Sequence, residues 1–154
     1  MFRKRTPDQR LFQAAEERSV RAARRAIEIG ANVNARDEFT RTALHIASLH
    51  GDVSLAAFLI SVGADVNSRD GHGNVPLRMC IASPFERSLD LAKMLIAKGA
   101  NIAARNEDDE SLLDAAAAHV RLDIANMLVG AADGHTPRTD ASSVDGQQRK
   151  QREL

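Results

Sequence analysis

The feature that most constrains the fold is a sequence unit that recurs along the chain at a nearly constant interval. A shift by one unit places Asp37 on Asp70 and Leu44 on Leu77, and a further, slightly longer shift places Leu59 on Leu95. Each unit contains two apolar segments of helical length. Units of this kind cannot bury an apolar face alone, so they stack on one another. The sequence therefore predicts an all-α solenoid of helix-turn-helix units.

The best-preserved unit also identifies a family. Its matching parts are the run 42–47 (Thr-Ala-Leu-His-Ile-Ala), Gly51, the pair 59–60 (Leu-Ile) and the run 63–67 (Gly-Ala-Asp-Val-Asn). The chain thereby resembles the ankyrin-repeat family, whose unit reads D-x-x-G-x-T-P-L-H-x-A-A, then G, then L-L-x-x-G-A-D-V-N. The resemblance runs from about Asp8 to about Asp133 and implies helix pairs joined by short β-turn loops, or fingers.

The repeat divides the chain into six segments. Residues 1–7 are a basic lead-in, and the repeat units cover about 8–36, 37–69, 70–105 and 106–134. The first and last units have polar or degraded motif positions, as terminal caps need. Residues 135–154 are too polar to bury themselves, and we expect disorder there, with a short docked helix over 147–154 as the alternative.

Several motif positions depart from the family pattern. Five residues stand where a turn glycine is expected, namely Arg18, Thr40, Asp109, Val120 and Ala132. Arg78 replaces the motif histidine of the third unit, and that unit is also enlarged within 82–87. We expect helices over 8–17, 19–29 and 89–98, and we expect His45 to bridge neighbouring loops through its ring nitrogens, as the resemblance implies.

Composition limits the classes of function. Lysine plus arginine and aspartate plus glutamate both number 21, so the net charge selects neither nucleic acid nor a membrane as partner. The charge is nevertheless uneven, because residues 1–36 have nine basic and four acidic side chains while residues 106–134 have one and seven. One cysteine and the absence of a signal-like or membrane-spanning apolar run predict a cytoplasmic protein, and delivery into a host cell stays open.

The sequence gives no pattern for catalysis, for a cofactor or for a metal. Cys80 and His45 can be imagined as a thiol and its base, but Cys80 falls in an inward alanine position of the repeat. The other histidines lie in different units, and the acidic run 107–110 lacks the spacing of a calcium loop. We therefore predict no enzyme, no cofactor and no metal.

The resemblance implies binding on a concave face formed by the fingers and the inner helices. The positions that the family leaves free for partners fall on Glu38, Phe39, Arg41, Leu49, His50, His72, Asn74, Ala82, Glu107, Asp108, Glu110, Ala118 and His119. Phe39 is singled out as an exposed aromatic beside an arginine, the composition of an interface hot spot. The alternative is that Phe39 folds back over the loop of the first unit.

Two further groups complete the predicted site. Arg36, Arg69 and Arg105 recur at one position and should form a positive ladder for carboxylates or phosphates, unless they pair with Asp37 and Asp70. Phe85, in the enlarged loop, would form an apolar centre with Leu49 if both were exposed.

These observations lead to one functional prediction. We expect a monomeric, non-catalytic module that binds another protein and, having no second domain in this sequence, acts by occupying, masking or bridging, as an inhibitor, immunity protein or adaptor. The alternatives are nucleic-acid binding through Arg18, Arg21, Arg24 and Arg25 of the first unit, a small enzyme using Cys80, and a structural or self-associating protein.

Overall fold

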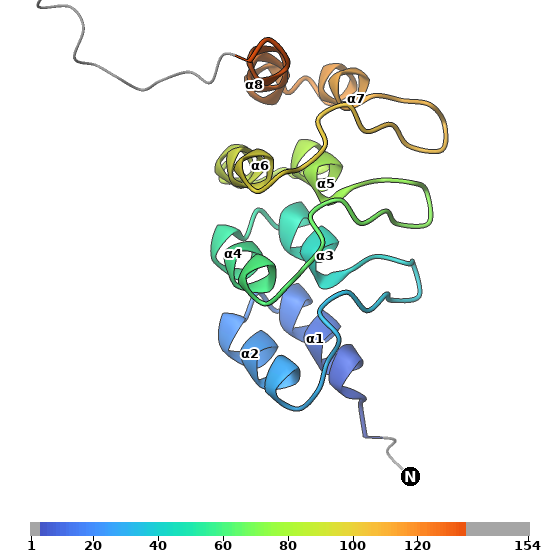
Figure 1. Cartoon of the computed structure of the whole chain (residues 1–154), viewed down its shortest axis with the longest axis vertical. Coiled ribbons are helices and arrows are strands. Elements are labelled where there is room, and N and C mark those ends of the chain that lie inside the picture. Colours follow the sequence, from blue (N-terminus) through green and yellow to red (C-terminus); the bar gives the residue numbers. More distant parts are fainter. Residues whose placement is uncertain (1–3, 135–154) are drawn as a thin grey trace, which may run out of the picture.

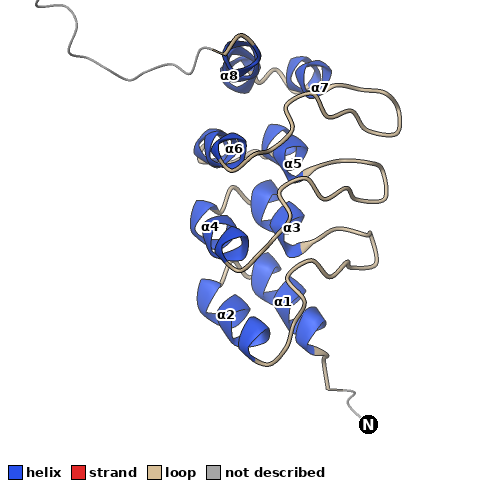
Figure 2. Ribbon diagram, in the orientation of Figure 1, coloured by secondary structure: helices blue, strands red, loops and turns tan. Residues whose placement is uncertain are grey.

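The structure is a computed structural model, and it describes residues 4–134. The eight helices of the described residues form four antiparallel pairs. The pairs are stacked along one axis, and the loops between them project to one side (Figure 1). Within the described residues the elements are helices and loops, with one isolated bridge between Arg105 and Ser111 (Figure 2). The helices are α1 (Pro7–Glu16), α2 (Val20–Glu28), α3 (Ala43–Leu49), α4 (Val53–Ser61), α5 (Pro76–Ala82), α6 (Ser88–Ala97), α7 (Leu112–Ala118) and α8 (Leu122–Ala132).

The all-α ankyrin-type solenoid predicted from the repeat is confirmed, and the predicted helices are found within a residue of their expected ends. The unit boundaries themselves stay a prediction. Local signals explain where helices begin. Thr6 caps α1 through a bond from the Gln9 backbone N–H to its hydroxyl, and Ser19 caps α2 in the same way with Ala22.

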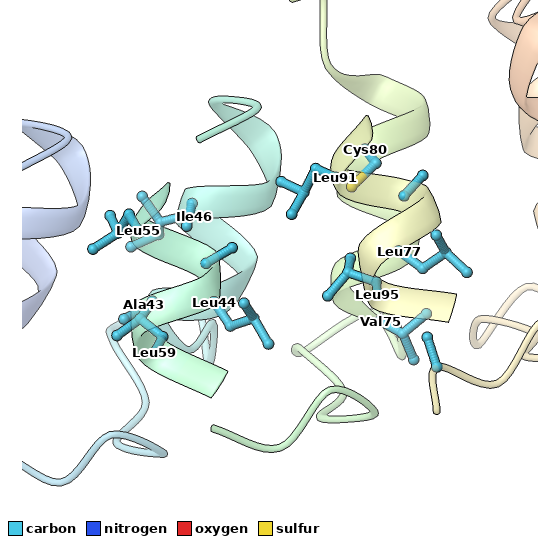
Figure 3. Close-up of a cluster of buried hydrophobic side chains, with 14 of the residues drawn as sticks. Ala43, Leu44, Ile46, Leu55, Leu59, Val75, Leu77, Cys80, Leu91 and Leu95 are labelled. Atoms are coloured by element: carbon cyan, nitrogen blue, oxygen red, sulfur yellow. The ribbon is translucent and has the colours of Figure 1, made fainter. Parts of the chain in front are cut away.

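The core runs along the stack between inner helices α1, α3, α5 and α7 and outer helices α2, α4, α6 and α8. It is built from fully buried leucines, among them Leu44, Leu59, Leu77 and Leu95 (Figure 3). Each such side chain contributes about 1.5–3 kcal/mol when buried. Alanines at neighbouring positions, among them Ala43, Ala47 and Ala56, are also fully buried and let the helices approach closely.

The turn positions that lack glycine keep the glycine conformation. Arg18, Thr40, Asp109 and Val120 all have positive φ, between 54° and 59°. Ala132, the fifth such position, is instead the last residue of α8, and the left-handed conformation falls on Gly134. Without glycine at 132 the helix simply continues until glycine permits the reversal.

Two kinds of side chain join adjacent pairs. Asn34 donates to the Gly63 carbonyl (3.0 Å) and accepts from the Asp65 backbone N–H (2.8 Å), and Asn67 repeats both bonds one pair further along. His45 accepts the Thr42 backbone N–H at Nδ1 (3.1 Å), so Nε2 bears the proton and donates to the Asn74 carbonyl (2.9 Å). The loop-bridging role expected of His45 is confirmed.

Candidate functional site: the finger face

Three fingers form one edge of the candidate site, at residues 37–41, 70–74 and 106–110. Each is closed by the side chain of its first residue. The Asp37 carboxylate accepts the backbone N–H groups of Phe39 (2.9 Å) and Arg41 (2.8 Å), and Asp70 and Asn106 make the equivalent two bonds in their fingers. Because the backbone of each tip is fixed by its own side chain, the tip residues are presented in a defined conformation.

Phe39 lies at the tip of the first finger, and 62% of it is exposed. The guanidinium carbon of Arg41 lies 5.1 Å from the centre of its ring. Arg41 is itself held by the Asp37 carboxylate (2.8 Å) and by Glu16 of α1 (3.5 Å). The prediction that Phe39 is exposed beside an arginine is thus met in the geometry, rather than the alternative in which it folds back over the first loop.

A groove of about 560 Å³ separates this finger from α1. Glu16 stands at its edge and binds both Arg41 and the His50 ring, the latter at 3.0 Å. The sequence reasoning missed Glu16, although a signal was present, since Glu16 lies one repeat before Leu49 and occupies the same partner-facing position. The groove is lined by Thr6, Asp8, Gln9, Phe12, Gln13, Glu16, Arg36, Asp37, Glu38 and Ile46.

The repeated arginines donate hydrogen bonds to backbone carbonyls in and beside the fingers. Nη1 of Arg36 donates to the Thr40 carbonyl (2.9 Å) and to the Arg69 carbonyl, and Nη1 of Arg69 donates to the carbonyls of Gly73 (3.1 Å) and Arg105 (2.6 Å). The suggested pairing with Asp37 and Asp70 is wrong, because Asp37 binds Arg41 and Asp70 binds Asn74. The ladder therefore joins each finger to the next, and anion binding by it stays a prediction.

The other finger residues separate into two groups. Glu38, His72, Glu107 and Asp108 are exposed at the tips. Asn74 and Glu110 are half-buried and engaged within the protein, Asn74 with Asp70 (3.3 Å) and Glu110 with Arg78 and Asn106. Arg78, which replaces the motif histidine, thus joins α5 to the third finger much as His45 joins α3 to the second.

The remaining predicted residues lie at the opposite ends of the inner helices. His50 and His119 follow α3 and α7, and Leu49 is half-buried. Phe85 lies over the turn at Gly51, with the Arg18 guanidinium 5.5 Å and the His50 ring 6.3 Å from its centre. The condition set for an apolar centre, exposure of both Leu49 and Phe85, is not met. Ala82 and Ala118 are exposed.

Two arginines of the first pair contact residues of other helix pairs. Arg18 pairs with Asp52 (3.8 Å) and lies over Phe85, while the Arg24 guanidinium lies 4.9 Å from the centre of the Phe58 ring. Two of the four cations proposed for nucleic acid therefore also contact aromatic rings of other pairs, although all four side chains are exposed.

The sulfur of Cys80 is buried, and burial raises the pKa of the Cys80 thiol to about 12. Such a thiol is protonated at neutral pH and is a poor nucleophile. Burial also lowers the pKa of His45, although its bond to the Asn74 carbonyl acts in the opposite direction. The burial of Cys80 and of His45 fits a role in the core and in loop bridging, respectively. Across residues 4–134 we find neither three clustered metal-ligating side chains nor a helix long and apolar enough to cross a membrane.

Comparison with known proteins agrees with this geometry. A family model described as ankyrin repeats (3 copies) matches residues 11–106. The chain belongs to the ankyrin-repeat family. It is also 32% identical over 111 residues to the tyrosine-protein kinase Shark of Drosophila melanogaster, an alignment that spans 71% of this chain and 12% of that protein. Ankyrin repeats indicate a protein-interaction module.

Proposed function

We propose that this ankyrin-repeat protein binds a partner protein on its concave face, with Phe39 as the main anchor. The observation that supports the proposal best is the fixed, exposed pair of Phe39 and Arg41. An aromatic ring that is already oriented loses little conformational freedom on binding, so most of its buried area contributes to affinity. The groove beside α1 offers room for a partner side chain next to this anchor.

The finer role belongs to the same proposal. A rigid face of this kind acts by occupying a surface of its partner, as an inhibitor, an immunity protein or an adaptor, and we propose that it does so in the cytoplasm. Glu38, His72, Glu107 and Asp108 line the tips beside or beyond Phe39 and would set specificity. The arginine ladder would act indirectly, by keeping the three fingers in register.

Affinity capture from the native cell's lysate tests the proposal, with Phe85→Ala as a matched control for Phe39→Ala. Both residues are exposed phenylalanines with an arginine over the ring, but they lie at opposite ends of α3. We expect a protein that wild type and Phe85→Ala retain and Phe39→Ala loses. Loss with Phe85→Ala alone would place binding at the helix turns and contradict the proposal.

A further inference from the structure

Within residues 4–134, the last helix pair has an apolar end that no other helix covers. Leu11, Leu44 and Leu77 occupy equivalent positions in the first three pairs, and each is completely buried. Leu44 and Leu77 point from their own pair toward the following one (Figure 3). Leu113 occupies the same position in the last pair and is 42% exposed. Leu113 thus keeps the leucine with which each earlier pair contacts the next one, although no further pair follows in the described structure.

Two residues of α8 enlarge this surface. Leu122 and Val129 are both exposed, and they stand in the positions of Leu89 and Ile96, which are half-buried and pack against the core. A terminal repeat normally replaces such residues with polar ones. We call Leu113, Leu122 and Val129 the leucine end.

The first pair has a complementary hollow at the other end of the stack. Ile46 and Leu55 point from the second pair toward the first (Figure 3), and the equivalent residues of the first pair are Gln13 and Ala22. Because alanine replaces leucine there, a hollow of about 660 Å³ remains. We call it the alanine hollow, and it is lined by Arg5, Arg10, Gln13, Ala14, Glu17, Ala22, Arg25, Ala26, Glu28 and Ile29.

The charges at the two ends of the stack are opposite at equivalent repeat positions. Neighbouring fingers touch, since the Glu107 backbone N–H donates to the His72 carbonyl at 3.0 Å. Lys4 and Arg5 lie one repeat before Asp37 and Glu38, so they correspond in sequence to the finger position, and Nη1 of Arg5 donates to the Gln13 side chain at the hollow. The third finger has four acidic residues at 107–110. A first pair stacked on the last pair would thus set two cations beside an acidic finger.

We propose that two copies of this chain associate head to tail, with the alanine hollow of one seated on the leucine end of the other. The contact would repeat the packing of α3 on α1 and of α4 on α2, and it would extend the row of fingers into the second copy. The contact is heterologous, so each dimer keeps one free hollow and one free leucine end. This departs from the monomer expected from the sequence.

Sedimentation equilibrium of the purified full chain, from about 10 µM to 1 mM, tests the proposal over the range of weak, small interfaces. We expect the average mass to rise with concentration. Leu113→Gln should weaken association about tenfold or more, because a buried leucine is lost from the contact. The control Val62→Gln changes an exposed apolar residue of the second pair and should leave the mass curve unchanged. A chain that stays monomeric throughout, as it would if residues 135–154 covered the leucine end, overturns the proposal.

Charge reversal separates head-to-tail contact from other forms of self-association. Lys4→Glu with Arg5→Glu, and Glu107→Lys with Asp108→Lys, should each reduce self-association. Mixing these two variants should restore it, since the reversed finger of one then meets the reversed lead-in of the other. If leucine ends pair with each other instead, Ala22→Glu would still dimerise, which contradicts the proposal. Each readout is independent of any partner of the finger face.

Discussion

Arg121 connects the last helix pair to the rest of the protein, and its replacement by alanine should destabilise that pair. Nη1 donates to the carbonyls of Cys80 (3.3 Å) and Ser83 (2.9 Å), and Nη2 donates to the hydroxyl of the buried Ser88 (3.0 Å). The remaining donors bind Asp123 at 3.0 and 2.9 Å. Every N–H of the guanidinium thus has an acceptor, and three of the bonds cross to the third pair, one each to α5, the enlarged loop and α6.

The size of the effect can be estimated from these bonds. A hydrogen bond from a charged donor is worth about 1.5–3 kcal/mol, and a buried acceptor left without a partner costs about 1–3 kcal/mol. The three crossing bonds are not additive, and 18% of the Arg121 side chain remains exposed to water, which can replace part of what is lost. We therefore expect Arg121→Ala to lower the free energy of unfolding by about 2–4 kcal/mol.

Urea unfolding followed by far-UV circular dichroism measures this change. Arg105→Ala is the control, because Arg105 is also an arginine of the last pairs but is mostly exposed, and it should cost under about 1 kcal/mol. Hydrogen exchange should locate the loss in α7 and α8, which lie at the end of the stack. A change within about 1 kcal/mol of wild type for Arg121→Ala, or equal losses for both variants, would refute the reasoning.

Three further predictions follow from single residues. Val120→Gly should raise the free energy of unfolding by about 1 kcal/mol, because the β-branched Val120 has φ 54° and its side chain is 76% exposed. The control Val62→Gly, at φ −101°, should lower the free energy of unfolding, and thermal melts of the two variants test the difference. Burial lowers the pKa of His45 below its unfolded value of 6.5, so the unfolded chain binds the proton more readily as the pH falls, and the free energy of unfolding should decrease below pH 6.5. Urea midpoints at pH 7.5 and pH 5.5 should therefore differ less in His45→Gln than in wild type. Cys80, with its thiol pKa near 12, should react with a disulfide reagent at pH 8 only after urea is added, and rapid labelling of the native protein would contradict its burial.

The repeat was enough to predict the fold. A position that recurs in every unit has the same backbone conformation each time, which explains the positive φ that Arg18, Thr40, Asp109 and Val120 have without being glycine. Ala132 does not keep the glycine conformation, because α8 extends through this residue.

The atoms that a repeated side chain contacts were harder to predict. The recurrence of Arg36, Arg69 and Arg105 shows that the position matters, but not that each guanidinium is bound to backbone carbonyls. Arg121 and Glu16 were missed because their partners, Ser83 and His50, lie in other pairs, beyond what local spacing reveals. The exposure of Phe39, by contrast, followed from its place at a loop tip.

The most direct test of the central claim, that the finger face binds the partner, is site-specific photo-crosslinking in the native cell. A photoreactive amino acid would be incorporated in place of Phe39 in one chain and in place of Phe85 in another, and the crosslinked products would be identified by mass spectrometry. We predict that position 39 yields one dominant protein partner and that position 85 does not yield it. The same partner crosslinked from position 85 and absent at position 39 would contradict the account.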